Sequence, residues 1–202
     1  MTARQLNLII LATLISPTMV FLNEIETSQW LINPKSNVGK IVPKSSEQDL
    51  MEAYGRENVK RSKISIGEGE FVEGTTLFPD TENELLIEWK DDFKNPRNLT
   101  IQSDQADWKL DNGIKIGTML SKIEKLNSTP FKLTGFEWDY PGRTVSWEKG
   151  KLPTQLQLEL EPSVDLPEKE RYQVVGDSSF SSSNAIIKKM KLKVRTIYIR
   201  WD

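Results

Sequence analysis

The chain has 202 residues, with 27 basic and 29 acidic side chains, 37% hydrophobic residues, and neither cysteine nor histidine. This composition excludes disulfides, a thiolate nucleophile, an imidazole base, iron–sulfur clusters and the usual zinc sites. The length suits one domain or two small ones, and the isoelectric point of about 5.5 argues against a nucleic-acid-binding protein. We therefore expect no cofactor, no metal and no nucleic-acid partner.

The first 22 residues resemble an export signal. Arg4 precedes an apolar run at residues 8–15, and a second apolar run follows Pro17. The first run is short for a membrane-spanning helix, and polar sequence begins at Asn23. No small-x-small cleavage pattern lies near residue 22, so an uncleaved N-terminal anchor is one alternative to a signal peptide. A buried N-terminal helix is the other. We predict an exported protein, periplasmic or secreted, whose only membrane contact would be through an uncleaved N-terminal segment.

Two similar segments predict an internal repeat. Ser45 and Thr118, each expected to cap a helix, lie 73 residues apart, and so do Leu50 and Ile123 on the expected apolar helix faces. Chance similarity of two short helices is the alternative. The expected helices cover residues 46–54 and 119–126.

This repeat predicts the fold class and the organisation of the chain. The predicted fold is α+β, with two copies of a short helix packed on an antiparallel β-meander. The predicted parts are a signal peptide or N-terminal anchor over 1–22, a first copy over 23–102, a connector over 103–113, and a second copy with the C-terminal strand over 114–202.

Alternating apolar and polar residues predict antiparallel strands with one solvated face, most clearly over 84–89, 98–102 and 156–161. The apolar positions change parity at Gly135, and again between Val194 and Ile197. Both changes indicate a bulge or a sharp bend.

Basic residues concentrate near the C-terminus, on an expected last strand over 191–201. Lys191, Lys193 and Arg195 would share one face of this strand. We expect an edge strand whose basic side chains block further pairing, with binding to an acidic partner or an anionic lipid surface as the alternative.

Short motifs of small, aromatic and charged residues recur along both halves of the chain: Glu68-Gly69-Glu70, Gly74-Thr75, Leu77-Phe78-Pro79, Ile87-Glu88-Trp89-Lys90, Leu126-Asn127, Pro130-Phe131-Lys132, Gly135-Phe136-Glu137-Trp138-Asp139-Tyr140 and Gly142. These motifs resemble those of a family of uncharacterised exported bacterial proteins with two helix-plus-sheet copies. The resemblance covers most of residues 38–160 and implies no activity. The repeated helix and meander is also similar in architecture to the beta-lactamase inhibitory protein and to the small lipoprotein of the outer-membrane barrel-assembly machinery. This chain lacks the lipidation cysteine of the latter, and both comparisons concern the fold alone.

The densest patch of aromatic and charged residues is the predicted binding site, with Trp138, Asp139, Tyr140 and Arg143 as its candidate residues. An aromatic ring beside an arginine and a carboxylate offers both stacking area and directional hydrogen bonds. The site is expected to centre on these residues and not on the turn at residues 67–70.

We expect residues 136–140 to form a strand, with Phe136, Trp138 and Tyr140 on one face and Glu137 and Asp139 on the other. Paired carboxylates beside aromatic rings could then bind or cleave a sugar. In the structural alternative, Phe136 and Trp138 belong to the core and the acids face solvent.

Two further motifs predict no catalytic site. Residues 67–70 place two carboxylates on a glycine-rich turn, which would repel a phosphate and is typical of a solvated hairpin. Ser146 and Lys149 have the Ser-x-x-Lys spacing of serine acyl enzymes, but the partner motifs are missing and the segment runs into a turn.

The sequence therefore predicts an exported, non-catalytic binding or interaction protein of the bacterial envelope, whose partner is a protein or a carbohydrate. No residue is predicted to be catalytic. The alternative is a carbohydrate-active enzyme or carbohydrate-binding protein that uses Glu137, Asp139 and the neighbouring aromatic residues. Opposed carboxyls about 5–10 Å apart across a cleft would favour the enzyme.

Overall fold

The computed structural model describes residues 29–201, so the predicted export signal at residues 1–22 lies outside the described part of the chain. Antiparallel strands and short helices make up this part, and β1 with β7 is the one parallel pair of strands within it. The predicted α+β class is confirmed.

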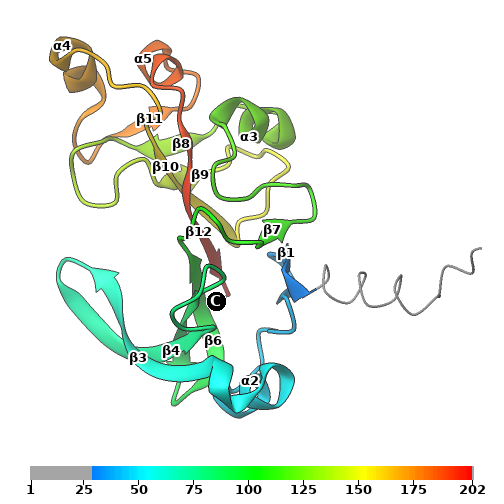
Figure 1. Ribbon diagram of the computed structural model, residues 1–202. Coiled ribbons are helices and arrows are strands. Elements are labelled where there is room, and N and C mark those ends of the chain that lie inside the picture. The colour runs from blue at the N-terminus through cyan, green and yellow to red at the C-terminus, as the bar shows by residue number, and fades with distance from the viewer. Residues whose placement is uncertain (1–28, 202) are drawn as a thin grey trace, which may run out of the picture.

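The largest sheet has six antiparallel strands, which lie in the order β10-β12-β6-β5-β4-β3 (Figure 1). Its strands are β3 (Val59–Gly67), β4 (Glu70–Leu77), β5 (Leu85–Asp91), β6 (Lys94–Ile101), β10 (Leu156–Glu161) and β12 (Lys193–Arg200). The strands expected over 84–89, 98–102 and 156–161 are thus confirmed. Because β12 pairs with β6, two distant parts of the chain share one sheet.

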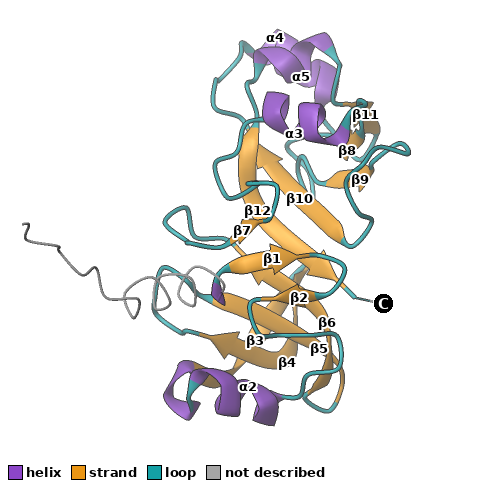
Figure 2. Ribbon diagram, turned by 90° about the vertical axis from the view of Figure 1, so that its right-hand side faces the viewer, coloured by secondary structure: helices purple, strands orange, loops and turns teal. Residues whose placement is uncertain are grey.

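Two three-stranded sheets complete the fold. The strands β1 (Leu31–Asn33), β2 (Asn37–Val38) and β7 (Lys109–Leu110) lie in front of the middle of the large sheet in Figure 2. The strand β8 (Lys132–Thr134) lies between β9 (Thr144–Ser146) and β11 (Ser179–Ser181). The expected connector therefore contains a strand, β7, directly after the fully buried Trp108.

The helices lie at the two ends of the large sheet. The helix α2 (Glu47–Tyr54) is at one end, while α3 (Leu120–Asn127), α4 (Glu168–Arg171) and α5 (Ala185–Lys189) are at the other (Figure 2). Two 3-10 turns, η1 (Arg56–Asn58) and η2 (Tyr172–Val174), follow α2 and α4. The helices expected over 46–54 and 119–126 are confirmed to within one residue.

The expected caps belong to different residues. Ser46, not Ser45, caps α2: its hydroxyl accepts from the Asp49 N–H, and Asp49 Oδ2 accepts from the Ser46 N–H at 2.7 Å. The hydrogen bonds from the Ser46 backbone and hydroxyl lower the pKa of the Asp49 carboxyl. Ser45 and Thr118 instead accept from the backbone three residues earlier, at 3.0 and 2.9 Å, and so close the turn before each helix.

The helices α2 and α3 occupy equivalent places. Each has eight residues, and their first residues, Glu47 and Leu120, lie 73 positions apart. Their first N–H groups donate to Phe93 and Leu192, just ahead of β6 and β12. The strands that follow the two helices differ. After α2, the strands β3 to β6 form one meander, whereas after α3 the strands β8 to β12 divide between two sheets. The two-copy organisation is therefore not confirmed and stays a prediction.

One hydrophobic cluster joins both ends of the described chain. Leu50 on α2 and Ile123 on α3 are 1% and 0% exposed, so both expected helix faces are buried. The large sheet contributes apolar residues of β4, β5, β6, β10 and β12 to the same cluster.

The strand β12 is central, which corrects the expected edge strand. It lies between β10 and β6. Two of its three basic side chains, and both of those on α5, are paired: Lys193 with Glu161, Arg195 with Glu159, Lys188 with Glu124, and Lys189 with Glu170. The sequence could not distinguish an edge strand from an interior strand. In both positions, basic residues on the solvent-facing side alternate with apolar residues on the core side.

The predicted irregularity of the last strand is confirmed. Glu159 pairs with Thr196 and Leu160 with Val194, so Arg195 is the extra residue of a bulge. This bulge shifts the apolar positions of β12 between Val194 and Ile197, as the parity change indicated.

Replacing Leu50 or Ile123 with alanine should lower the free energy of unfolding by about 2–5 kcal/mol, because each change leaves a cavity in a shared core. Lys125→Ala, on the exposed side of α3, is the matched control and should change stability by less than about 0.5 kcal/mol. Urea denaturation measures all three. Losses below about 0.5 kcal/mol at both buried sites would contradict the assigned helix faces.

Candidate functional site

A groove of about 690 Å³ lies on the polar face of the large sheet. Its floor consists of side chains that alternate with core-facing residues, among them Glu88, Asn98, Thr100, Gln157, Glu159, Tyr198 and Arg200. The β3–β4 hairpin curves out on one side of this groove, and the loop between β8 and β9 lies on the other (Figure 1). We refer to this groove as the cleft.

The loop between β8 and β9 replaces the strand expected over residues 136–140. The strand β8 ends at Thr134, and Glu137 and Tyr140 have φ angles of 58° and 57°, which an extended strand does not allow. Phe136 is buried whereas Trp138 is 61% exposed, so the two rings do not share a face. The strand β8 ends just before Gly135, where a bulge or bend was expected, and a β-carbon at this residue would overlap the carbonyl oxygens of Val174 and Gly176.

Tyr140 connects this loop to the β3–β4 hairpin through a hydrogen bond. Its hydroxyl donates to the Ile66 carbonyl at 3.4 Å. Gly67 has a φ of 101°, and a β-carbon at this position would overlap the Tyr140 hydroxyl. Glycine is therefore required both for the turn and for the close approach of the tyrosine.

Arg143 is the centre of a network at the floor of the cleft. Its guanidinium lies between the rings of Tyr140 and Tyr198, at 4.2 and 4.6 Å from their centroids. Nη2 donates to Tyr198 Oη at 2.9 Å and to Glu159 Oε2 at 3.2 Å. The Tyr198 hydroxyl donates to the same carboxylate oxygen at 3.2 Å, and Arg195 pairs with the other oxygen at 3.6 Å.

This network keeps a buried charge paired. Glu159 is only 7% exposed, and burying a carboxylate is tolerated when cations and hydrogen bonds surround it. Stacking on two rings and pairing with Glu159 together hold the Arg143 guanidinium in one orientation.

Two buried polar atoms of the cleft have no hydrogen-bond partner within residues 29–201: Arg143 Nε and Asn98 Oδ1. The first is a donor and the second is an acceptor. The third such atom in this part of the chain, Arg171 Nε, lies 3.4 Å from Glu137 in an ion pair.

The structure brings most of the predicted site together. Asp139, Tyr140 and Arg143 line the cleft, whereas Trp138 lies exposed on the same loop and does not line it. Glu137 pairs with Arg171 near α4 at 3.4 Å. The turn at residues 67–70, on which the site was not expected to centre, contributes Gly67 and Glu68 to the cleft.

Sequence reasoning missed Glu159 and Tyr198, which complete the network. Glu159 on β10 and Tyr198 on β12 each alternate with core residues. The sequence feature that could have identified them as site residues was therefore their position on the polar face of a strand. That signal marks a solvated position equally well, and only the pairing of β12 with β10 brings the two together.

Within residues 29–201, no group of three or more acidic side chains is arranged to hold a metal ion. Across the same described range, no helix has the length and apolar content needed to cross a membrane. No family model, curated protein or solved structure matches this sequence, so neither the family resemblance nor the architectural similarities are tested by comparison.

Two of the four tyrosines should ionise late in a pH titration of the folded protein. Burial raises the pKa of Tyr54 to about 12, although its hydroxyl accepts from the Lys40 N–H. Burial and then the charge of Glu159 raise the pKa of Tyr198. The folded state thus retains protons that the unfolded state loses near pH 10, so these groups' contribution to stability falls as the pH rises through that region.

Tyrosinate absorbance of the parent, Tyr54→Phe and Tyr198→Phe tests this expectation. Each variant should lack a step that the parent shows above about pH 10. If the step missing from Tyr198→Phe lies at or below that pH, Tyr198 is not buried beside Glu159.

Proposed function

We propose that this protein is an exported, non-catalytic binding protein of the bacterial envelope, and that its ligand occupies the cleft. The observation that carries the proposal is the pair of unpartnered buried atoms, Arg143 Nε and Asn98 Oδ1. An unsatisfied buried polar atom costs about 1–3 kcal/mol. Such atoms are rare in folded proteins, and two of them among the lining residues of one groove support a binding site there.

The chemistry of the cleft favours a protein ligand. Arg143 Nε needs an acceptor and Asn98 Oδ1 needs a donor, and a peptide group carries both. Tyrosine and arginine are residue types that often dominate the binding energy of protein interfaces. Because its neighbours already hold Arg143 between two rings, binding would cost little side-chain entropy there.

The acidic residues favour binding over catalysis. Within the cleft, Glu88 pairs with Arg97, and Glu159 pairs with Arg143 and Arg195. A carboxylate held in an ion pair is directed at its cation and not at a ligand, so Glu88 and Glu159 are placed to organise the cleft.

A carbohydrate ligand is the second candidate. Trp138 is 61% exposed on the loop that carries Asp139 and Tyr140, and an exposed indole is a surface on which a sugar ring can stack. Glu137 is engaged with Arg171, so the carbohydrate-active version would rely on Asp139.

The envelope location rests on the apolar run within residues 1–22. Export would place a cysteine-free chain in an oxidising compartment, where its stability comes from the core alone. Fractionation of cells that produce the full chain tests this step, which recovery of all the protein from the cytosol would contradict.

Affinity capture from an envelope extract, with the full chain as bait, tests the binding proposal. Asn98→Leu removes the unpartnered acceptor and should leave the folded state as stable as the parent or more so, because an unsatisfied buried atom is lost. The same change should weaken binding of the captured component by about tenfold or more.

Gln48→Leu, an amide replaced on α2 outside the cleft, is the matched control and should bind like the parent. Equal capture by parent and Asn98→Leu would place the ligand elsewhere. A glycan-array signal that disappears in Trp138→Ala would favour the carbohydrate candidate.

A further inference from the structure

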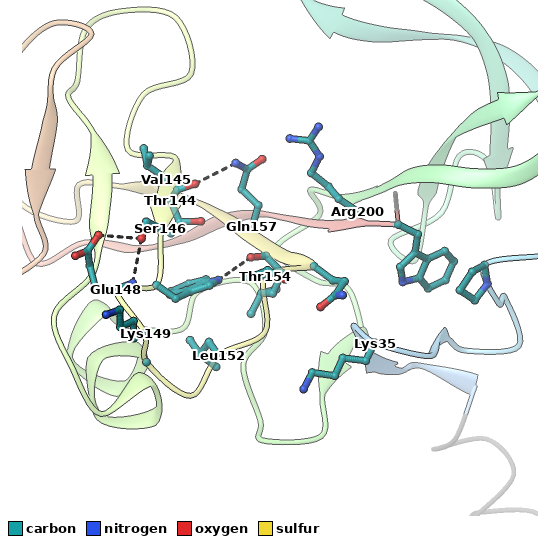
Figure 3. A pocket seen from close by; sticks show the side chains of 16 residues that line it. Lys35, Thr144, Val145, Ser146, Glu148, Lys149, Leu152, Thr154, Gln157 and Arg200 are labelled. Carbon is teal, nitrogen blue, oxygen red and sulfur yellow. Dashed lines mark hydrogen bonds between the residues drawn. The ribbon is translucent and has the colours of Figure 1, made fainter.

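A second groove, of about 750 Å³, lies beside the cleft (Figure 3). Residues of β9, β10 and the turn between them form one wall, and Lys35 and Pro43 approach from the N-terminal part of the described chain. Gln157 and Arg200 line both grooves and therefore form the ridge between them. We refer to this second groove as the basic groove.

The charges of the basic groove are unbalanced. Lys35, Lys149 and Arg200 line it, against a single acid, Glu148. None of these three cations forms an ion pair with a carboxylate of residues 29–201. In the cleft, by contrast, Arg97, Arg143 and Arg195 are all paired.

The one acid is already engaged. Glu148 Oε1 accepts from the Ser146 hydroxyl at 2.8 Å, and this hydroxyl also accepts from the Glu148 N–H at 3.1 Å (Figure 3). Ser146 therefore interacts with Glu148 and not with Lys149, so the Ser-x-x-Lys spacing marks a turn beside the groove.

Two tryptophans fix the backbone near the cations. The Trp147 indole donates to the Leu156 carbonyl at 2.9 Å, which anchors the tight turn that carries Lys149. The Trp201 indole donates to the Pro34 carbonyl at 2.8 Å. Because Pro34 precedes Lys35 and Trp201 follows Arg200, this bond joins the two segments that carry these cations. Hydrogen bonds from the two indoles thus hold the backbone segments from which these cations extend.

We propose that the basic groove binds a ligand with two or more anionic groups, either carboxylates or phosphates. Lys35, Lys149 and Arg200 have no carboxylate partner within residues 29–201, and in a protein with a net charge of −2 they form a local positive region that attracts such a ligand. Lysine ammonium groups act as point charges that suit either kind of anion. The Thr154 and Gln155 side chains line the same groove and add neutral hydrogen-bonding groups.

Calorimetric titration of the full chain with two probes tests the proposal. Tripolyphosphate represents the phosphate source and tetragalacturonate the carboxylate source, with maltotetraose as the neutral comparison. Binding of either anion, absent with maltotetraose and weakened by added salt, is the expected result. Whichever probe binds more tightly identifies the source.

The variants Lys35→Gln and Lys149→Asn should each weaken binding by about two- to fivefold, as expected for exposed charges. Asparagine suits residue 149, whose φ is 63°, so the turn is retained. Arg200 is left unchanged because it also lines the cleft, and the result is then independent of the ligand proposed there. Lys125→Gln, on α3 away from the groove, is the matched control.

Three results would overturn the proposal. They are no binding of either anion at low salt, unchanged binding by the double variant at residues 35 and 149, and equal weakening by Lys125→Gln. The last result would show a general response to surface charge.

Discussion

The pairing of β12 with β6 is the constraint on which the rest of the structure depends. It joins Ile197 to Ile101 and Arg200 to Asn98 across about one hundred residues of chain, so closing this contact carries a substantial entropy cost. Burial of the apolar face of β12 offsets this entropy cost, because it completes a core shared by α2 and α3. Its polar face places Tyr198 and Arg200 beside Asn98 and Thr100, which forms the cleft floor.

Local patterns predicted the parts of this fold that local physics decides. The helices follow their apolar faces and turn residues, and the irregularity of β12 at Arg195 follows the change in apolar parity. The order of the strands was not predictable in this way. A central β12 and an edge β12 present the same alternation, and the choice depends on contacts with β6 and β10, which no local window contains.

The candidate site was predicted in part for the same reason. Asp139, Tyr140 and Arg143 stood out because they are adjacent in a short aromatic and charged segment. The partners of Arg143, Glu159 and Tyr198, lie on strands that reach it only after the large sheet forms. Both strands also bring Gln157 and Arg200 to the ridge between the cleft and the basic groove, so one sheet positions the Arg143–Glu159 network beside a groove whose cations have no carboxylate partner within residues 29–201.

Native-state hydrogen exchange of β6 and β12 tests most directly whether one sheet unites the molecule. Amides that bond between these strands should exchange with the same free energy as global unfolding measured in urea, because opening the pair removes both the shared core and the cleft floor. A contradictory result would be exchange of β12 and the second-half strands through an opening that leaves β3, β4 and β5 protected. The two parts would then be independent folding units, and the cleft would not be a product of their union.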